Sequence, residues 1–293
     1  MVILYDGKLI ALRKLSSKKS DTIATEIVTI LTEKNIVPSI AVCDTEPTNT
    51  GHKNGVIARL QIKFPNIIYE PCRLHILDLV IKHQIISVFG SHSSSPNLSY
   101  PFIKTIQQNW SKFKDEIEYK MITEDLPNLS DFPGNDERRN DYRLLLCLVK
   151  AVHFLRSDKV MYKFHLPLNP PSVSQARWNS KAIFCLLAEI LNLDRERIYE
   201  LNTFILNFWA QCWFGVRDKV NWNLLYNSNL ISKKGKSVLE KHNLFQQELR
   251  PPTNEAAERV FRMMNEKISH CQTFSNLELM MIQYYNEQFR LNF

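Results

Sequence analysis

The first 90 residues alternate short apolar runs with segments of helical periodicity, and this order constrains the fold more than any other feature. The expected strands and helices follow one another as 2–6, 23–33, 40–43, 55–63, 66–69 and 73–82. Strands separated by helices pair in parallel, because each helix crosses back over the sheet. The alternation therefore predicts an α/β layer at the start of the chain.

After residue 101 the strand signal almost disappears. A Ser- and Pro-rich stretch at 91–101 has the composition of a linker. The later segments of helical periodicity are 140–154, 174–193, 195–217, 236–247, 254–268 and 277–290. We expect three regions: an α/β part in 1–135, a helical insertion in 136–250 and C-terminal helices in 251–293.

The charge balance of the chain is basic, with a net charge of +7 and a pI of about 9.0. Lys and Arg side chains favour polyanionic partners, because their binding to phosphate releases counterions. The same surplus also occurs in proteins that never meet nucleic acid. The most apolar stretch, 204–215, is much shorter than the ~20 residues that a membrane helix needs. We expect an intracellular protein with no membrane partner.

Three acids stand out by their position: Asp6 and Asp44 each follow an expected strand, and Glu258 lies in the penultimate expected helix. Carboxylates that converge beyond a sheet can hold two divalent cations about 4 Å apart, which activate a nucleophile and stabilise a leaving oxygen at a phosphodiester. An alternative for Asp44 stays open. The residues that follow it, including Thr45 and Asn49, equally favour a turn built by side-chain hydrogen bonds.

Several sequence blocks resemble those of hAT-superfamily DNA transposases. Tyr5-Asp-Gly-Lys8 is similar to the strand that carries the first acid in one branch of the group. Cys43-Asp-Thr-Glu-Pro-Thr-Asn-Thr-Gly51, with Asn54-Gly-Val-Ile-Ala-Arg-Leu60, resembles the second-acid block. Pro71-Cys-Arg-Leu-His75 is similar to the Cys-x-x-His element that follows the next strand.

Two later blocks extend the resemblance. Gln175-Ala-Arg-Trp-Asn-Ser180 resembles the Arg-Trp element at the start of the family's helical insertion, and Thr253-Asn-Glu-Ala-Ala-Glu-Arg-Val-Phe261 resembles the block that carries the last acid. All five elements occur in the family's order over nearly the whole chain. The resemblance implies an RNase H-like core with a reduced sheet, a mainly helical insertion and C-terminal helices.

The resemblance also implies roles for single residues. Asp6, Asp44 and Glu258 would be the catalytic carboxylates and would bind Mg²⁺ or Mn²⁺. Trp178 would stack on an extruded base, because every base offers an aromatic face. The remaining contacts to DNA would come from Arg177, Cys72 and His75.

Other interpretations of these residues stay open. Cys72 and His75, three positions apart, would share a helical face and could form half of a zinc site. No second pair with suitable spacing follows, and the six cysteines of the chain are scattered, so we expect no structural zinc and reduced thiols. Trp178 equally fits a core position.

The chain departs from the family pattern in three places. The 38 positions between Asp6 and Asp44 show no convincing pair of alternating strands, where an RNase H-like sheet has a hairpin. The helical insertion is short, and the zinc-finger module of full-length relatives has no counterpart before the first strand. That module reads transposon ends, so we expect only weak, nonspecific DNA binding here.

Three functions therefore compete. The leading interpretation is a catalytically impaired or domesticated relic that binds nucleic acid in the nucleus and forms homo-oligomers through its C-terminal helices. The alternative is an active, metal-dependent transposase that cuts DNA and transfers strands. A third possibility is a chain without a stable fold, because a lost hairpin would expose apolar surface.

Overall fold

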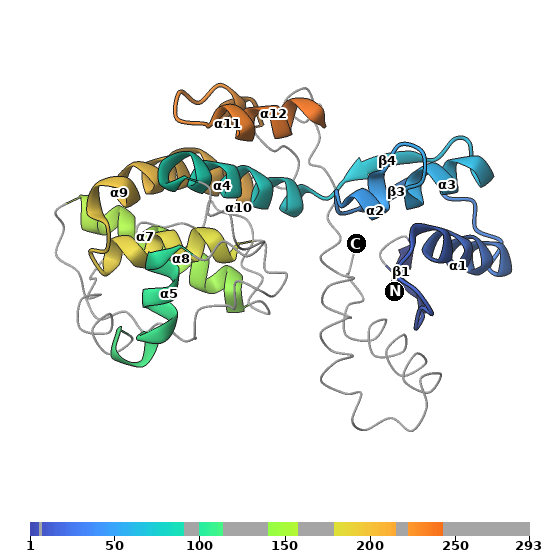
Figure 1. Cartoon of the computed structure of the whole chain (residues 1–293), viewed down its shortest axis with the longest axis horizontal. Coiled ribbons are helices and arrows are strands. Elements are labelled where there is room, and N and C mark those ends of the chain that lie inside the picture. The colour runs from blue at the N-terminus through green and yellow to red at the C-terminus, as the bar shows by residue number, and fades with distance from the viewer. Residues whose placement is uncertain (6–7, 91–99, 114–139, 158–178, 215–221, 243–293) are drawn as a thin grey trace. The chain divides into compact units, whose positions relative to one another are not determined.

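The computed structural model describes residues 1–5, 8–90, 100–113, 140–157, 179–214 and 222–242 (Figure 1). The chain divides into two compact units, one containing Met1–Arg73 and the other Leu74–Arg250. We call the described part of the first the N-terminal unit and the described part of the second the helical unit.

The N-terminal unit begins with an antiparallel hairpin. Strands β1 (Val2–Tyr5) and β2 (Lys8–Leu12) pair with Tyr5 opposite Lys8. Strand β2 lies where the sequence predicts only a turn and one helix before the strand 40–43, so that prediction is wrong for residues 8–12. In the described part of the interval from Asp6 to Asp44, β2 is the only strand before β3, so no pair of strands is inserted there. The signal was present, because Asp-Gly between two apolar runs is typical of a two-residue hairpin loop. The basic residues between 13 and 19 follow this hairpin, and a turn is predicted there.

A parallel pair of strands forms the second sheet of this unit. Strand β3 (Ile40–Cys43) lies beside β4 (Ile68–Pro71), with Ile40 opposite Ile68 and Cys43 opposite Pro71. The connection between them contains the short helix α2 (Pro47–Thr50) and α3 (Val56–Lys63). This strand–helix–strand order confirms a small α/β arrangement. The described strands form two separate two-stranded sheets rather than one.

Helix α1 (Ser20–Glu33) packs against α3 and against the parallel strands. The contact is apolar because α1 presents Ala24 with Ile23 and Ile27, while α3 presents Ile57 and Leu60. Ala41 and Tyr69 on the strands close this small core from the sheet side. The first helix therefore secures the connection between β3 and β4 to the rest of the unit.

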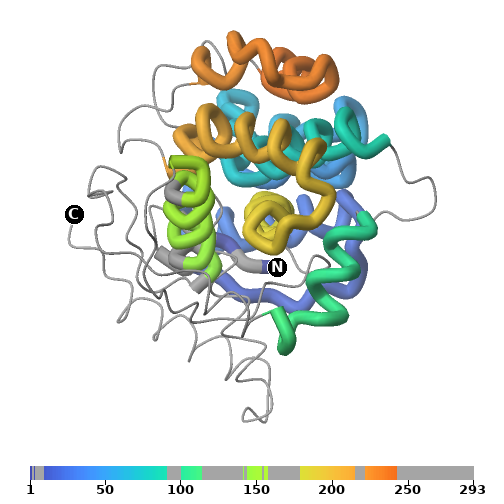
Figure 2. Tube along the Cα trace, turned by 90° about the vertical axis from the view of Figure 1, so that its left-hand side faces the viewer, coloured from blue at the N-terminus to red at the C-terminus, as the bar shows by residue number. Residues whose placement is uncertain are grey.

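The helical unit contains the other helices, which Figures 1 and 2 show. They are α4 (Arg73–Phe89, whose first residue closes the N-terminal unit), α5 (Pro101–Gln108), α7 (Asn140–Arg156), α8 (Ser180–Ile190), α9 (Arg195–Phe204), a π-helical turn (Ile205–Trp209), α10 (Ala210–Phe214), α11 (Trp222–Tyr226) and α12 (Lys233–Lys241). The segment predicted as one helix from 195 to 217 thus contains a π turn, and its last three residues lie outside the described ranges.

Helix α8 is the centre of the helical unit, with α5, α7 and α9 packed around it (Figure 2). Its residues from Ala182 to Ala188 are all completely buried, because its sequence is apolar on every side. A helix of this kind is stable only inside a core. One charged network lies beside it, in which Arg156 binds both carboxylate oxygens of Glu189 at 2.7 and 2.8 Å.

No helix in the described ranges is both long enough and apolar enough to cross a membrane.

Candidate nucleic-acid interface

The Asp44 carboxylate organises the turn that follows β3. Its Oδ1 atom accepts hydrogen bonds from the backbone N–H of Glu46 at 3.1 Å and from the Asn49 side-chain amide at 2.7 Å. The Thr50 hydroxyl donates to the carbonyl of Glu46 at 3.1 Å. These bonds confirm the turn that we had kept as an alternative for Asp44. At least one oxygen of this carboxylate therefore has a structural role.

The end of the same turn is packed so tightly that only glycine fits at two positions. A Cβ atom on Gly55 would lie 2.5 Å from the backbone nitrogen of Gly51 and 2.6 Å from its oxygen. A Cβ atom on Gly51 would lie 2.9 Å from the carbonyl oxygen of Pro47. Both glycines have ordinary negative φ angles, so the requirement comes from close backbone approach. The two glycines bring α2 and the start of α3 together.

Four other residues of the predicted site cannot be compared with Asp44 in this structure. Asp6, Arg177, Trp178 and Glu258 lie outside the described residues. Within the described ranges no three His, Cys, Asp or Glu side chains gather closely enough to hold a metal ion. The convergence of Asp44 with the two other acids stays a prediction.

Cys72 and His75 do not share a helical face as predicted. Cys72 precedes the helix, is completely buried, and donates its backbone N–H to the carbonyl of Cys43 at 2.9 Å, which extends the pairing of β3 and β4. His75 lies in the first turn of α4, which begins at Arg73. Cys72 belongs to the N-terminal unit and His75 to the helical unit. Proline at residue 71 ends the strand, so Cys72 is the connection between strand and helix.

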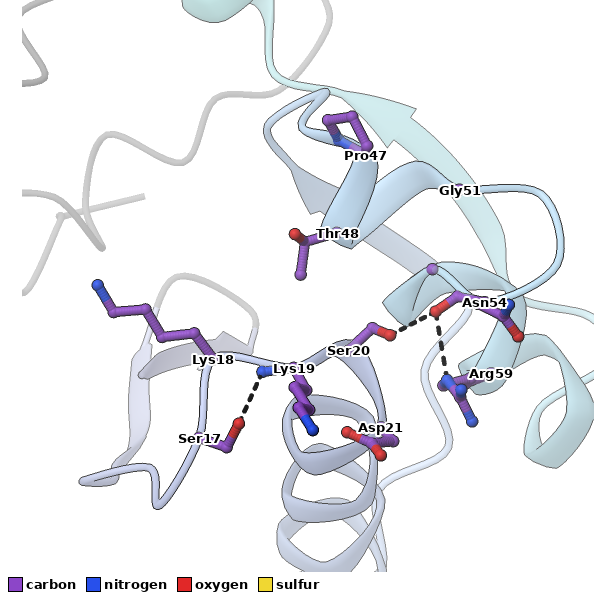
Figure 3. A pocket seen from close by; sticks show the side chains of 11 residues that line it. Ser17, Lys18, Lys19, Ser20, Asp21, Pro47, Thr48, Gly51, Asn54 and Arg59 are labelled. Carbon is purple, nitrogen blue, oxygen red and sulfur yellow. Dashed lines mark hydrogen bonds between the residues drawn. The ribbon is translucent and has the colours of Figure 1, made fainter.

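The structure brings together a set of residues that the sequence did not single out. An open hollow of about 780 Å³ lies between the segment before α1 and the turn before α3 (Figure 3). We call it the basic hollow. The residues that line it are Ser17–Asp21, Pro47, Thr48, Gly51, Asn54, Gly55 and Arg59.

Hydrogen bonds to one carbonyl hold the two sides of the basic hollow together. The carbonyl oxygen of Asn54 accepts from the hydroxyl of Ser20 at 2.5 Å and from Nε of Arg59 at 3.3 Å (Figure 3). Ser20 is the first residue of α1, and Arg59 lies on α3. The Ser20–Asn54 bond joins residues 34 positions apart. It therefore holds the start of α1, which follows Lys18 and Lys19, beside the turn that contains Gly51 and Gly55.

The charges around the basic hollow are mostly positive. Lys18, Lys19 and Arg59 line it together with one carboxylate, that of Asp21. The backbone N–H of Thr22 donates to Asp21 at 2.6 Å, and this bond is the main reason that the pKa of Asp21 lies below its usual value. Arg59 and Lys19 lower this pKa further. A surplus of two positive charges remains on the lining.

The fold divides the basic residues found between positions 13 and 19 of the sequence. Arg13 pairs with Glu26 on α1 at 3.4 Å. Lys18 and Lys19 are exposed and form no ion pair within the described ranges. The sequence signal for the basic hollow was therefore the lysine pair just before a helix start, but its other side was not visible without the fold.

Compared with protein-family models, with curated proteins and with solved structures, the chain shows no significant match.

Proposed function

We propose that this chain is a nucleic-acid-binding protein derived from a hAT-type transposase, and that it binds DNA weakly and without sequence preference. The observation that carries the proposal is the basic hollow. Six of its lining residues, between Pro47 and Arg59, belong to the block that resembles the second-acid motif, and they face Lys18 and Lys19. Such a cationic surface supports contact with phosphates.

The role of Asp44 supports binding over cleavage. Its Oδ1 atom stabilises the turn that forms one wall of the basic hollow. A turn-forming carboxylate is useful to a binding protein whether or not a metal is present. The residue can thus persist in a protein that no longer cuts DNA.

An active transposase is the second candidate, and one observation favours it. Asp44 directly follows a strand of a parallel pair, the position at which α/β proteins present functional side chains. Asp6, Asp44 and Glu258 would then hold Mg²⁺ or Mn²⁺ within an RNase H-like core, and Trp178 with Arg177 would contact the DNA end.

Two variants of Asp44 separate the candidates. Asp44→Asn keeps an oxygen that can accept both hydrogen bonds but removes the charge, whereas Asp44→Ala removes both bonds. For a binding protein we expect Asp44→Asn to bind duplex DNA at least as tightly as the original chain, as measured by fluorescence anisotropy. Asp44→Ala should lose about 1–2 kcal/mol of stability, because two hydrogen bonds disappear.

A DNA-nicking assay with Mg²⁺ or Mn²⁺ tests the second candidate, the active transposase. Metal-dependent nicking by the original chain that disappears in the folded Asp44→Asn variant would establish the transposase and overturn the binding-only role. Absence of any salt-sensitive DNA binding would overturn the proposal itself.

The proposal further includes a nuclear location and self-association through residues 251–293. We expect sedimentation of the full chain to show a dimer at micromolar concentration, and a chain that ends at residue 250 to lose it. A monomer in both cases would contradict this part of the proposal.

A further inference from the structure

We infer that the basic hollow is a phosphate-binding site that holds the sugar–phosphate backbone of nucleic acid and does not read the bases. This inference rests on the proposed function, which it narrows to a site and to a mode of recognition. It follows from the charge of the lining, from its hydrogen-bond donors and from the side chains that the lining lacks.

The cations approach the basic hollow from two sides. Lys18 and Lys19 precede α1, and Arg59 projects from α3 on the other side of the view (Figure 3). The Nε atom of Arg59 is used by the carbonyl of Asn54, which leaves its terminal nitrogens as donors. Cationic residues therefore lie on both sides of the basic hollow, and the Lys18 side chain extends away from Arg59 in Figure 3. This spread suits a segment of backbone with several phosphates better than a single phosphate.

The backbone adds further positive character. Helices α1, with 14 residues, and α3, with 8 residues, both begin at the basic hollow, and the side chain of neither N-cap residue accepts a hydrogen bond from the first turn. In α1 the N–H of Thr22 is already bound by Asp21. The first N–H groups of a helix have no acceptor within the helix, and they carry partial positive charge.

The lining contains no aromatic side chain. Apart from the charged residues it consists of Ser, Thr, Asn, Pro and Gly. Proteins that hold single-stranded bases do so mainly by stacking them on aromatic rings. Without such a ring the basic hollow can contact phosphate and sugar, and these contacts carry no sequence information.

The volume fits this assignment. About 780 Å³ lies within the ~300–1,000 Å³ typical of ligand clefts. A single phosphate fills only part of such a space, so the site has room for a segment of backbone. A small phosphate compound would bind through the same charged groups. The experiment must therefore distinguish binding of a nucleic-acid backbone from binding of such a compound.

A pair of double variants tests the site. Lys18→Gln with Lys19→Gln removes two charges from the basic hollow, and Lys34→Gln with Lys63→Gln removes two charges from the opposite ends of the same helices. All four lysines are exposed, so both proteins should fold, which circular dichroism checks. Binding is measured on the full chain by anisotropy with a labelled single-stranded oligonucleotide and with an abasic strand of equal length.

We expect the basic-hollow variant to bind both strands roughly tenfold more weakly, and its salt dependence to fall by about 0.7 in slope for each lost phosphate contact. The control variant should stay within about twofold of the original chain, because its charges lie farther from the bound phosphates. Intact and abasic strands should bind alike, and pyrophosphate should compete with both.

Three results would contradict the inference or the proposed function, and they can be told apart. If both double variants lose affinity equally, DNA binds elsewhere, and the proposed function survives without this site. If the intact strand binds much more tightly than the abasic strand, the bases are read and the inference is wrong. If pyrophosphate binds but neither strand does, the basic hollow serves a small phosphate compound, and the proposed nucleic-acid function fails instead.

Discussion

The two units of this protein are stabilised in different ways. In the helical unit, α8 is buried along its whole central part, from Ala182 to Ala188. The N-terminal unit has a smaller core, and its large apolar side chains Val37, Ile40, Ile62 and Ile68 are between 56% and 82% exposed. The first unit depends more on local devices: the Asp44 hydrogen bonds, the close approach of Gly51 and Gly55, and the Ser20–Asn54 bond.

Burial of apolar side chains therefore stabilises the helical unit more than the N-terminal unit. A helix core resists change because every side chain in it has lost contact with water. The proposed binding surface lies in the unit with little core, where loops present charged groups. Local opening is also easier where few apolar contacts must break.

The distribution of tryptophan provides separate readouts for the two units. All five tryptophans of the chain fall between residues 110 and 222, within the range of the helical unit. Tryptophan fluorescence therefore reports on that unit, while hydrogen exchange of peptides from β3 and α3 reports on the other.

The largest effect is expected in the core of the helical unit. Phe184 is completely buried, so Phe184→Ala should lower the free energy of unfolding by about 3–5 kcal/mol, through lost burial and the cavity that remains. Urea denaturation followed by tryptophan fluorescence measures this. Leu155→Ala on α7, where the side chain is 38% exposed, is the control and should cost much less. Equal losses would contradict the assignment of α8 as the centre of the core.

The next effect concerns the turn of the N-terminal unit. Gly55→Ala places a methyl group 2.5 Å from the Gly51 backbone, and relieving this overlap should cost about 1–3 kcal/mol. We expect faster hydrogen exchange in β3 and α3 and an unchanged fluorescence transition. Gly235→Ala is the matched control, because there the Cβ would meet only side chains, the nearest at 3.0 Å. Normal exchange in Gly55→Ala would show that the turn tolerates a side chain.

The smallest effect is the pH dependence that a single histidine adds to the helical unit. Burial, followed by Lys241 and His75, lowers the pKa of His242 to about 4 from an ordinary value of 6.5. The unfolded chain thus takes up this proton first as the pH falls. The contribution to stability is complete above pH 6.5 and is lost as the pH falls to about 4.

Comparison with His242→Gln isolates this contribution, because burial also shifts the pKa values of His83 and Asp78 in the same unit. As the pH falls from 6.5 to 4, the free energy of unfolding of the original chain should decrease more than that of His242→Gln. A constant difference over that range would contradict the lowered pKa.

Much of the local structure could be predicted from the sequence. The expected strand 40–43 agrees with β3 at both ends, and α7 and α9 begin where the periodicity indicated. Pro38 and Asp44 bound the strand, and residues of these types interrupt regular pairing for local reasons. Helix α4 continues to Phe89, beyond the expected end at 82, and in this extension Ile85 is completely buried and Phe89 contacts the rings of Tyr100 and Phe102.

The candidate site was less predictable. The sequence left Asp44 open between a metal ligand and a turn, and the hydrogen bonds to Glu46 and Asn49 established the turn. The lysine pair was visible as a basic segment but had no assigned target. Its partner Arg59 lies 40 positions away from Lys19. No local pattern predicts that the two will line one hollow.

The local sequence accounts for most strands and helices, although β2 was missed, because hydrophobic periodicity and turn residues act over a few neighbouring positions. It also determined the surplus of positive charge. Only the tertiary structure decided that Lys18, Lys19 and Arg59 meet around one space, through the packing of α1 on α3 and a hydrogen bond between Ser20 and Asn54. The physical reason is distance along the chain: contacts between remote residues depend on how whole elements bury their apolar faces.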